Sequence, residues 1–146
     1  MDTVLTALHV VAAVFVIGPM AILPMTALRA VRAGNAPVVE LLGTSTRIFT
    51  LASLLVAFLG FAVLGVLGKT EDVSVGSGWV LTSIVLYVVA LALALFVVVP
   101  SLQKAATALT AEGPTGAQSL YGRIAASSGI VALLLVAVTV LMVWRP

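Results

Sequence analysis

Four long stretches of uncharged, mainly apolar residues alternate with short polar segments along the chain. They cover about residues 3–28, 48–68, 79–103 and 124–144. An α-helix crosses a bilayer core of about 30 Å with about 20 residues, so each stretch is long enough to span a membrane. The pattern predicts an all-α, polytopic membrane protein in which residues 1–146 form one transmembrane domain. The simplest arrangement is two helical hairpins packed as a four-helix bundle.

The composition supports this fold class and excludes several functions. Hydrophobic residues make up 62% of the chain and charged residues 8%, whereas a soluble domain carries about 25% charged residues. The chain has no cysteine, which excludes disulfides, thiolate metal sites, iron–sulfur ligation and cysteine nucleophiles. A net charge of +2 from few charged side chains is too small for a nucleic-acid interface.

The distribution of Lys and Arg predicts the orientation in the membrane. The second connecting segment has Lys69, together with Glu71 and Asp72, and the C-terminus has Arg145. The other basic residues lie in the first and third connecting segments: Arg29, Arg32, Arg47, Lys104 and Arg123. Because Lys and Arg near the ends of spans stay on the cytoplasmic side, both termini are expected to face outward.

Two further features agree with this topology. Trp79 and Trp144 both fall at the predicted outer interface, where an indole ring is favoured. On the inner side, residues 33–37 and 112–116 contain Gly and Pro and read as turns between helices. Residues 38–46 and 117–122 are expected to continue the helices past the membrane surface.

A weak internal repeat relates the two halves of the chain. A shift of 76 residues superposes Pro24 on Pro100 and the pair Arg47-Ile48 on Arg123-Ile124. Identity elsewhere is poor, so a true duplication and chance matching in an apolar sequence both remain open. A duplication would relate the hairpins by an axis along the membrane normal.

The single histidine, His9, is the main candidate for chemistry inside the membrane. It lies about two turns into the first span, at a depth similar to that of Tyr87 in the third span and near that of Thr139 in the fourth. A His9–Tyr87 hydrogen bond across the bundle is therefore one interpretation. A haem ligand, a quinone contact or a proton relay is the functional alternative. We favour a neutral histidine, because one histidine cannot supply the paired axial ligands of a typical membrane b-type haem.

Pro19 and Pro24 interrupt the first span, and each removes a backbone donor, so a bend is expected there. A broken helix whose free carbonyls coordinate an ion is the functional alternative. We favour a kink that fits the helix to its neighbour, because none of the spans has Asp or Glu at depth. The same absence argues against a proton-coupled transporter or a channel with a charged filter.

Small residues on the second and fourth spans predict close helix packing, either within the bundle or against a partner. The candidate packing positions are Gly60, Gly65 and Gly129. Serines and threonines at 44–53 and 127–128 lack a nearby histidine and are interpreted as interhelical hydrogen-bonding groups. Arg47 and Arg123 are expected to anchor the helices to headgroups, and the sharper alternative is binding of a partner carboxylate or cardiolipin.

The run His9-Val10-Val11-Ala12-Ala13, followed by Gly18 and a basic turn, resembles a family of small four-helix predicted integral membrane proteins of actinobacteria, generally of unassigned function. Some small actinobacterial membrane proteins of this kind are accessory subunits of the respiratory supercomplex of cytochrome bcc and aa3 oxidase. The resemblance implies a supporting role in such an assembly, without catalytic residues to carry over.

These observations favour a non-catalytic subunit of a larger integral membrane complex of the cell membrane. No enzyme pattern is visible in the sequence, so we expect no catalytic residue, no cofactor and no metal site of its own. The expected partners are other integral membrane subunits and lipids, and no nucleic acid. A small transporter or channel, and a haem- or quinone-handling protein built around His9, are the alternatives.

Overall fold

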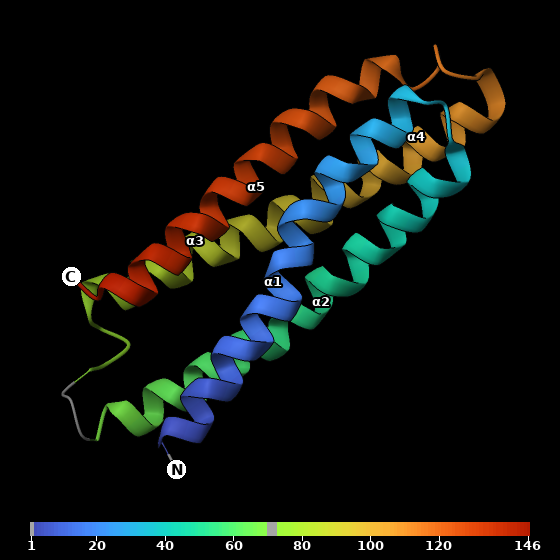
Figure 1. Ribbon diagram of the computed structural model, residues 1–146. Coiled ribbons are helices and arrows are strands. Elements are labelled where there is room, and N and C mark those ends of the chain that lie inside the picture. The colour runs from blue at the N-terminus through green and yellow to red at the C-terminus, as the bar shows by residue number, and fades with distance from the viewer. Residues whose placement is uncertain (1, 70–72) are drawn as a thin grey trace.

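The computed structural model describes residues 2–69 and 73–146. Glu71 and Asp72 of the predicted second connecting segment therefore lie outside the described residues. The described chain is helical throughout, apart from its turns (Figure 1). Its elements are α1 (Asp2–Arg32), α2 (Ala36–Leu67), α3 (Gly78–Leu93), the π-helical turn η1 (Ala94–Val98), α4 (Val99–Glu112) and α5 (Gln118–Trp144). Because α3, η1 and α4 follow one another directly, they form one long rod.

Within the described residues, four helical stretches are long and apolar enough to cross a membrane. They are Thr3–Arg32, Ala36–Leu67, Gly78–Glu112 and Gln118–Trp144. Each contains or closely matches one of the predicted spans, and neighbouring helices in the chain run antiparallel (Figure 1). The predicted all-α, multi-pass architecture is therefore confirmed.

The helices extend beyond the predicted spans at the end that carries the two short turns. The predicted helical continuation of residues 38–46 is confirmed, since α2 begins at Ala36, and α5 likewise begins at Gln118. At 1.5 Å per residue, the part of α2 from Arg47 to Leu67 measures about 30 Å, the thickness of a bilayer core. The first turns of α2 therefore project about 16 Å past Arg47, outside the hydrocarbon.

The two turns at this end are closed by glycine and by a side-chain cap. Gly34 and Gly113 have φ of 68° and 73°, a left-handed conformation that ends a helix and that glycine adopts without strain. Asn35 caps α2, because its Oδ1 accepts a hydrogen bond from the Val38 backbone N–H at 3.3 Å. A Cβ on Gly34 would lie 3.1 Å from Cγ of Pro114, so the two turns touch.

Proline has different effects in the two halves of the chain. Pro100 is separated from the π-helical turn by Val99, whose backbone N–H donates to the carbonyl of Ala94. Proline lacks the N–H and clashes with the carbonyl four residues earlier, and a π-turn widens the helix at that level. Pro19 and Pro24, by contrast, lie inside an unbroken α1. The alternative of a broken first helix is therefore wrong.

Each helix of one hairpin has its main contact with one helix of the other, and a smaller contact joins α1 and α4. α1 packs against α2 and α5, α4 packs against α2 and α5, and α3 packs against α5. If α1 were exchanged with the α3–η1–α4 rod and α2 with α5, the same pairs of helices would be in contact. That is the two-fold arrangement expected of a duplication, although Pro24 is buried and its counterpart Pro100 is only half-buried.

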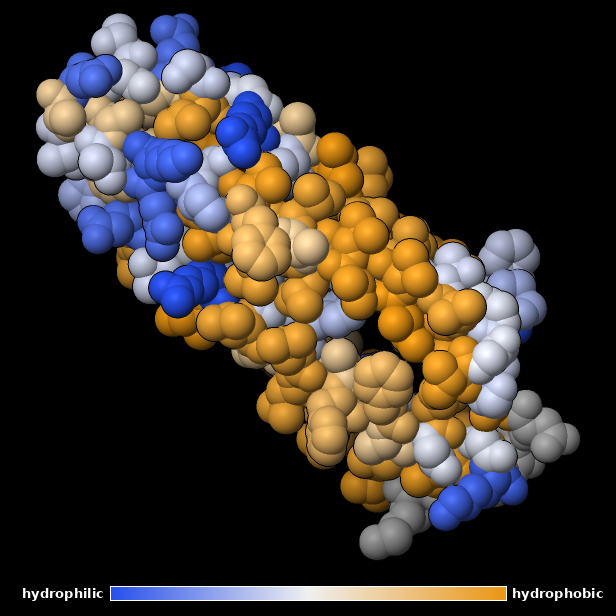
Figure 2. Space-filling model, turned by 180° about the vertical axis from the view of Figure 1, so that it is seen from behind, coloured by the Kyte–Doolittle hydropathy of each residue, from blue (hydrophilic) through white to orange (hydrophobic). Residues whose placement is uncertain are grey.

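The core lies mainly in the half of the bundle nearest the short turns. Among described side chains, those of α1 are buried only from Met20 onward, and those of α2 only between Val39 and Val56. Towards the other end, the α1–α2 pair diverges from the α3–α5 pair (Figure 1). Figure 2 shows an opening between the two pairs there, surrounded mainly by hydrophobic residues.

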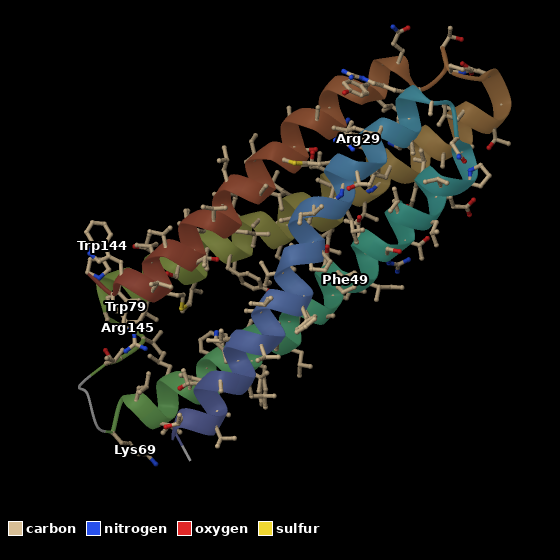
Figure 3. All side chains as sticks on the ribbon, in the orientation of Figure 1. Arg29, Phe49, Lys69, Trp79, Trp144 and Arg145 are labelled. Carbon is tan, nitrogen blue, oxygen red and sulfur yellow. The ribbon has the colours of Figure 1, made fainter. Side chains whose placement is uncertain are left out.

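The two ends of the bundle differ in polarity. A broad hydrophobic band covers the middle, and one end is rich in hydrophilic residues (Figure 2). Figure 3 shows Trp79, Trp144, Arg145 and Lys69 at the end where the termini lie, whereas Arg29 lies towards the other end. The basic residues and the two tryptophans thus lie at opposite ends of the bundle, and by the positive-inside rule the end with Arg29 is expected to be cytoplasmic.

Candidate functional site

His9 lies on the outer half of α1 and faces α2 at Gly60. A Cβ on Gly60 would lie 3.0 Å from Cε1 of His9, so the imidazole occupies the space that the missing side chain leaves. The Nδ1 atom of His9 is buried and has no hydrogen-bond partner among the described residues. A buried polar atom without a partner is costly, which makes His9 the feature of the outer half that most needs a further contact.

Tyr87 bonds to α2 rather than to His9. Its hydroxyl lies 2.8 Å from Oγ of Ser53. Ser53 Oγ already donates its only hydrogen to the carbonyl of Thr50 at 2.6 Å, so the Tyr87 hydroxyl is the donor in this pair. The predicted His9–Tyr87 hydrogen bond is therefore wrong.

The geometry of α2 explains this outcome. Ser53 and Gly60 are seven residues apart, which places them on the same stripe of the helix, about 10 Å apart along its axis. Tyr87 reaches the stripe at Ser53, and His9 reaches it at Gly60. The similar depth predicted for the two groups is therefore not observed, because Tyr87 and His9 contact α2 at levels about 10 Å apart.

The other buried hydroxyl groups bond to their own helices. Thr46 and Thr50 donate to the carbonyls of Leu42 and Thr46, each at 2.7 Å. In α5, Ser127 and Ser128 likewise donate to backbone carbonyls one turn earlier, and the outer hydroxyl of Thr139 donates to the carbonyl of Leu135. For these buried residues of α2 and α5 the predicted interhelical bonding is thus wrong, since a helix offers its own carbonyl four residues back, whereas at Ser53 it is confirmed.

The candidate packing glycines lie in different surroundings. Gly60 is in contact with His9, whereas no atom lies within 4 Å of a Cβ built on Gly65 or Gly129. Gly43, which the sequence did not single out, is buried in α2, and a Cβ there would lie 3.3 Å from Cβ of Leu102 in α4. Close helix approach inside the bundle therefore occurs at Gly43 and Gly60, while Gly65 and Gly129 border open space.

The basic residues at the cytoplasmic end are on the surface. Arg47 and Arg123 are exposed, and in the described part of the chain neither forms an ion pair. Arg32, at the end of α1, lies over the ring of Tyr121 in α5, with its guanidinium carbon 4.7 Å from the ring centre. This cation–π contact joins the two hairpins, and the sequence offered only the charge of Arg32 as a signal.

The arrangement has little capacity for metal chemistry in the part of the chain that the structure describes. Residues 2–69 and 73–146 hold no group of three or more His, Cys, Asp or Glu side chains close enough to bind a metal ion together. His9 could offer one ligand atom. The hydroxyl groups of Ser53 and Tyr87 already bond to each other, and Ser53 also bonds to the carbonyl of Thr50. The candidate site is therefore a single imidazole that packs on Gly60 and whose Nδ1 has no hydrogen-bond partner among the described residues.

Comparison with known families gives a match that covers residues 3–146. The matching family is described as predicted integral membrane protein (DUF2269). The chain belongs to this family. The chain has no match among the curated proteins and none among the solved structures.

The match to DUF2269 includes all of the candidate spans found among the described residues. The protein is thus an integral, multi-pass membrane protein, and the resemblance to a family of predicted integral membrane proteins is confirmed. The family description assigns no complex and no chemistry, so the roles of His9, Arg47, Arg123 and the open glycines stay predictions.

Proposed function

We propose that this DUF2269 protein is a non-catalytic subunit that packs inside the membrane against a larger integral membrane complex. The observation that carries the proposal is a stripe of small residues on α5. Gly122, Ala126 and Gly129 follow at spacings of four and three residues, which places them on one face of the helix. The space beside both glycines is open, and Gly122 and Ala126 are exposed.

Such a stripe suits a helix partner better than lipid. Glycine weakens a helix by about 1 kcal/mol relative to alanine, and a face in contact with lipid gains nothing in return. Against another helix, small residues let the two backbones approach closely and gain van der Waals contact. Arg123 follows Gly122, so it lies beside the cytoplasmic end of this stripe, and it is exposed, so it can meet a partner carboxylate or the phosphate of cardiolipin.

A respiratory assembly of cytochrome bcc and aa3 oxidase is the first candidate for the complex, on the strength of the family resemblance of the sequence. The buried hydroxyl groups support a non-catalytic role, since those of α2 and α5 bond to backbone carbonyls and are not directed at a shared pocket. The transporter alternative loses its main support with the unbroken α1.

The test is affinity purification of the tagged full chain from its native membranes in a mild detergent. Other integral membrane subunits are expected to co-purify, and the haem absorption bands of the preparation report whether cytochromes are among them. A Gly129→Leu variant is expected to lower partner recovery at least tenfold, because the new side chain occupies the space through which a partner helix would approach.

Gly65→Leu is the matched control, since Gly65 also borders open space but lies on α2. It is expected to retain the partner, and both variants are expected to keep the helical circular dichroism of the wild type. Purification of the wild-type chain alone, or equal partner recovery by both variants and the wild type, would contradict the proposal. Recovery of a complex without haem would retain the subunit role and remove the respiratory assignment.

A further inference from the structure

Two arginines at the end of α1 lie beside a tyrosine of α5. Arg29 and Arg32, in the last turn of α1, are exposed and three residues apart, so their Cβ atoms are about 5 to 6 Å apart. The guanidinium carbon of Arg32 lies 4.7 Å from the ring centre of Tyr121. Because α1 packs against α5, these three residues form an arginine–tyrosine cluster that bridges the two hairpins.

The charge of this cluster has no counterpart in the part of the chain that the structure describes. Neither Arg29 nor Arg32 forms an ion pair there. The hydroxyl of Tyr121 is accessible and bonds to no described residue. Two guanidinium groups and one hydroxyl group therefore offer a double positive charge with free N–H and O–H donors, which is the complement of a phosphate.

The ring of Tyr121 fixes the position of one guanidinium group. Tyr121 packs against the hydrophobic core, so the ring itself is held. A guanidinium over the face of a ring keeps the N–H groups at its edge available, and these form bidentate bonds to a phosphate. Arg32 therefore presents a preorganised fork, which loses less freedom on binding than an unsupported exposed side chain does.

The cluster lies at the level of the lipid headgroups. The uncharged run of the first span ends at Leu28, and that of the fourth span begins at Ile124. Arg29 directly follows the first boundary, and Arg32 and Tyr121 lie about 4 to 6 Å beyond the boundaries of their helices. The headgroup layer on each side of the hydrocarbon core is about 5 to 7 Å thick. The phosphates nearest to the cluster are therefore those of the bilayer.

We propose that the arginine–tyrosine cluster binds the phosphate of an anionic glycerophospholipid, in the leaflet at the end of the bundle that is expected to be cytoplasmic. Arg32 holds the phosphate through its N–H fork, while Arg29 adds a second charge and Tyr121 a hydroxyl donor. The site lies beside the packing stripe of α5 and not on it, because Tyr121 is turned by about 100° from Gly122. Lipid binding here does not depend on the proposed partner complex.

The test uses the full chain reconstituted in vesicles of phosphatidylglycerol and phosphatidylcholine in equal parts and then extracted in a mild detergent. Native mass spectrometry measures the lipid that stays bound, and the wild type is expected to retain phosphatidylglycerol in about fivefold excess or more. Arg32→Gln is expected to lower the retained phosphatidylglycerol about tenfold, the effect of one charge-assisted hydrogen bond. Tyr121→Phe keeps the ring and removes the hydroxyl, so a loss of about threefold is expected.

Lys104→Gln is the matched control. Lys104 is exposed on α4 and directly follows the third uncharged run, so this variant removes the same charge at the same membrane level. It is expected to retain phosphatidylglycerol as the wild type does. Arg32→Lys separates charge from geometry, because lysine keeps the charge but loses the fork, and a loss of about threefold is expected. All variants are expected to keep the helical circular dichroism of the wild type.

Four results would overturn the proposal. Equal retention of the two lipids would show that the cluster does not select an anion, and an equal loss in Lys104→Gln would show general attraction to surface charge. Displacement of phosphatidylglycerol by millimolar inorganic phosphate would assign the cluster to a soluble anion. Lower partner recovery by Arg32→Gln, with unchanged lipid retention, would assign it to a protein carboxylate.

Discussion

The hydrogen bond between Tyr87 and Ser53 links the two hairpins inside the membrane, and its two ends are expected to respond differently to mutation. Tyr87→Phe removes the donor but leaves Ser53 bonded to the carbonyl of Thr50 at 2.6 Å. Ser53→Ala removes the acceptor and leaves the tyrosine hydroxyl without its partner. Because an unsatisfied polar group costs more than a lost bond, Ser53→Ala is expected to lower the free energy of unfolding further than Tyr87→Phe.

The expected coupling energy follows from the length and burial of the Tyr87–Ser53 hydrogen bond. Interhelical hydrogen bonds in membranes couple by about 0.6 kcal/mol on average and up to about 1.7 kcal/mol. The 2.8 Å distance and the half-buried tyrosine place this bond within that range, so a coupling energy of about 0.6 to 1.7 kcal/mol is expected from the double-mutant cycle. The loss from Tyr87→Phe alone is expected to be below about 1.5 kcal/mol.

The assay is reversible unfolding in mixed micelles, with sodium dodecyl sulfate as the denaturant and far-ultraviolet circular dichroism as the signal. The two single variants, the double variant and the wild type complete the cycle. Thr139→Val serves as the control, since its hydroxyl donates only to the carbonyl of Leu135. A coupling energy indistinguishable from zero, or a larger loss from Tyr87→Phe than from Ser53→Ala, would refute this account of the bond.

The remaining predictions concern packing, the contact between hairpins and the topology. Gly43→Val is expected to destabilise the bundle by about 1 to 3 kcal/mol in the same assay, because the added atoms meet the α4 helix at 3.3 Å; an unchanged midpoint would contradict the close approach. Tyr121→Leu is expected to cost about 0.5 to 1 kcal/mol in wild type and nothing in an Arg32→Ala background, and equal losses in both would exclude the cation–π contact. With no native cysteine, Val75→Cys is expected to react with an impermeant thiol reagent in whole cells and Thr115→Cys only after lysis; the reverse pattern would invert the topology.

The number of spans and their fold class could be derived from the sequence because they rest on a one-dimensional quantity. An uncharged apolar run of sufficient length must become a helix in a bilayer, where every backbone group needs an internal partner. The positions of Lys and Arg added the expected orientation, and the two tryptophans agree with it in the structure. The extension of α2 on the N-terminal side of Arg47 could also be anticipated, since residues 38–46 contain no proline and Gly43 is their single glycine.

The sequence could not show which side chains meet, and the site depends on that. Counting turns from the outer end of each span predicts similar depths for His9 and Tyr87, but the tilt and rotation of each helix decide that His9 packs on Gly60 and Tyr87 bonds to Ser53, about 10 Å apart along α2. The serines and threonines were expected to bond between helices, yet a carbonyl one turn back in the same helix is always within reach. The opening in the outer half has no counterpart in the sequence pattern, because its walls are as apolar as the packed inner half.

By itself, the sequence determined that the chain lies in a membrane, that it crosses the membrane as four helices, and that its basic residues gather at one end. These properties follow from the transfer of each segment from water to lipid, which composition and order along the chain largely decide. Only the tertiary structure decided where the two hairpins touch, which glycines are in contact, and that His9 packs on Gly60 with its Nδ1 unpartnered among the described residues. Those properties depend on helix rotation and crossing, and within lipid they are governed by packing between side chains that are nearly all equally hydrophobic.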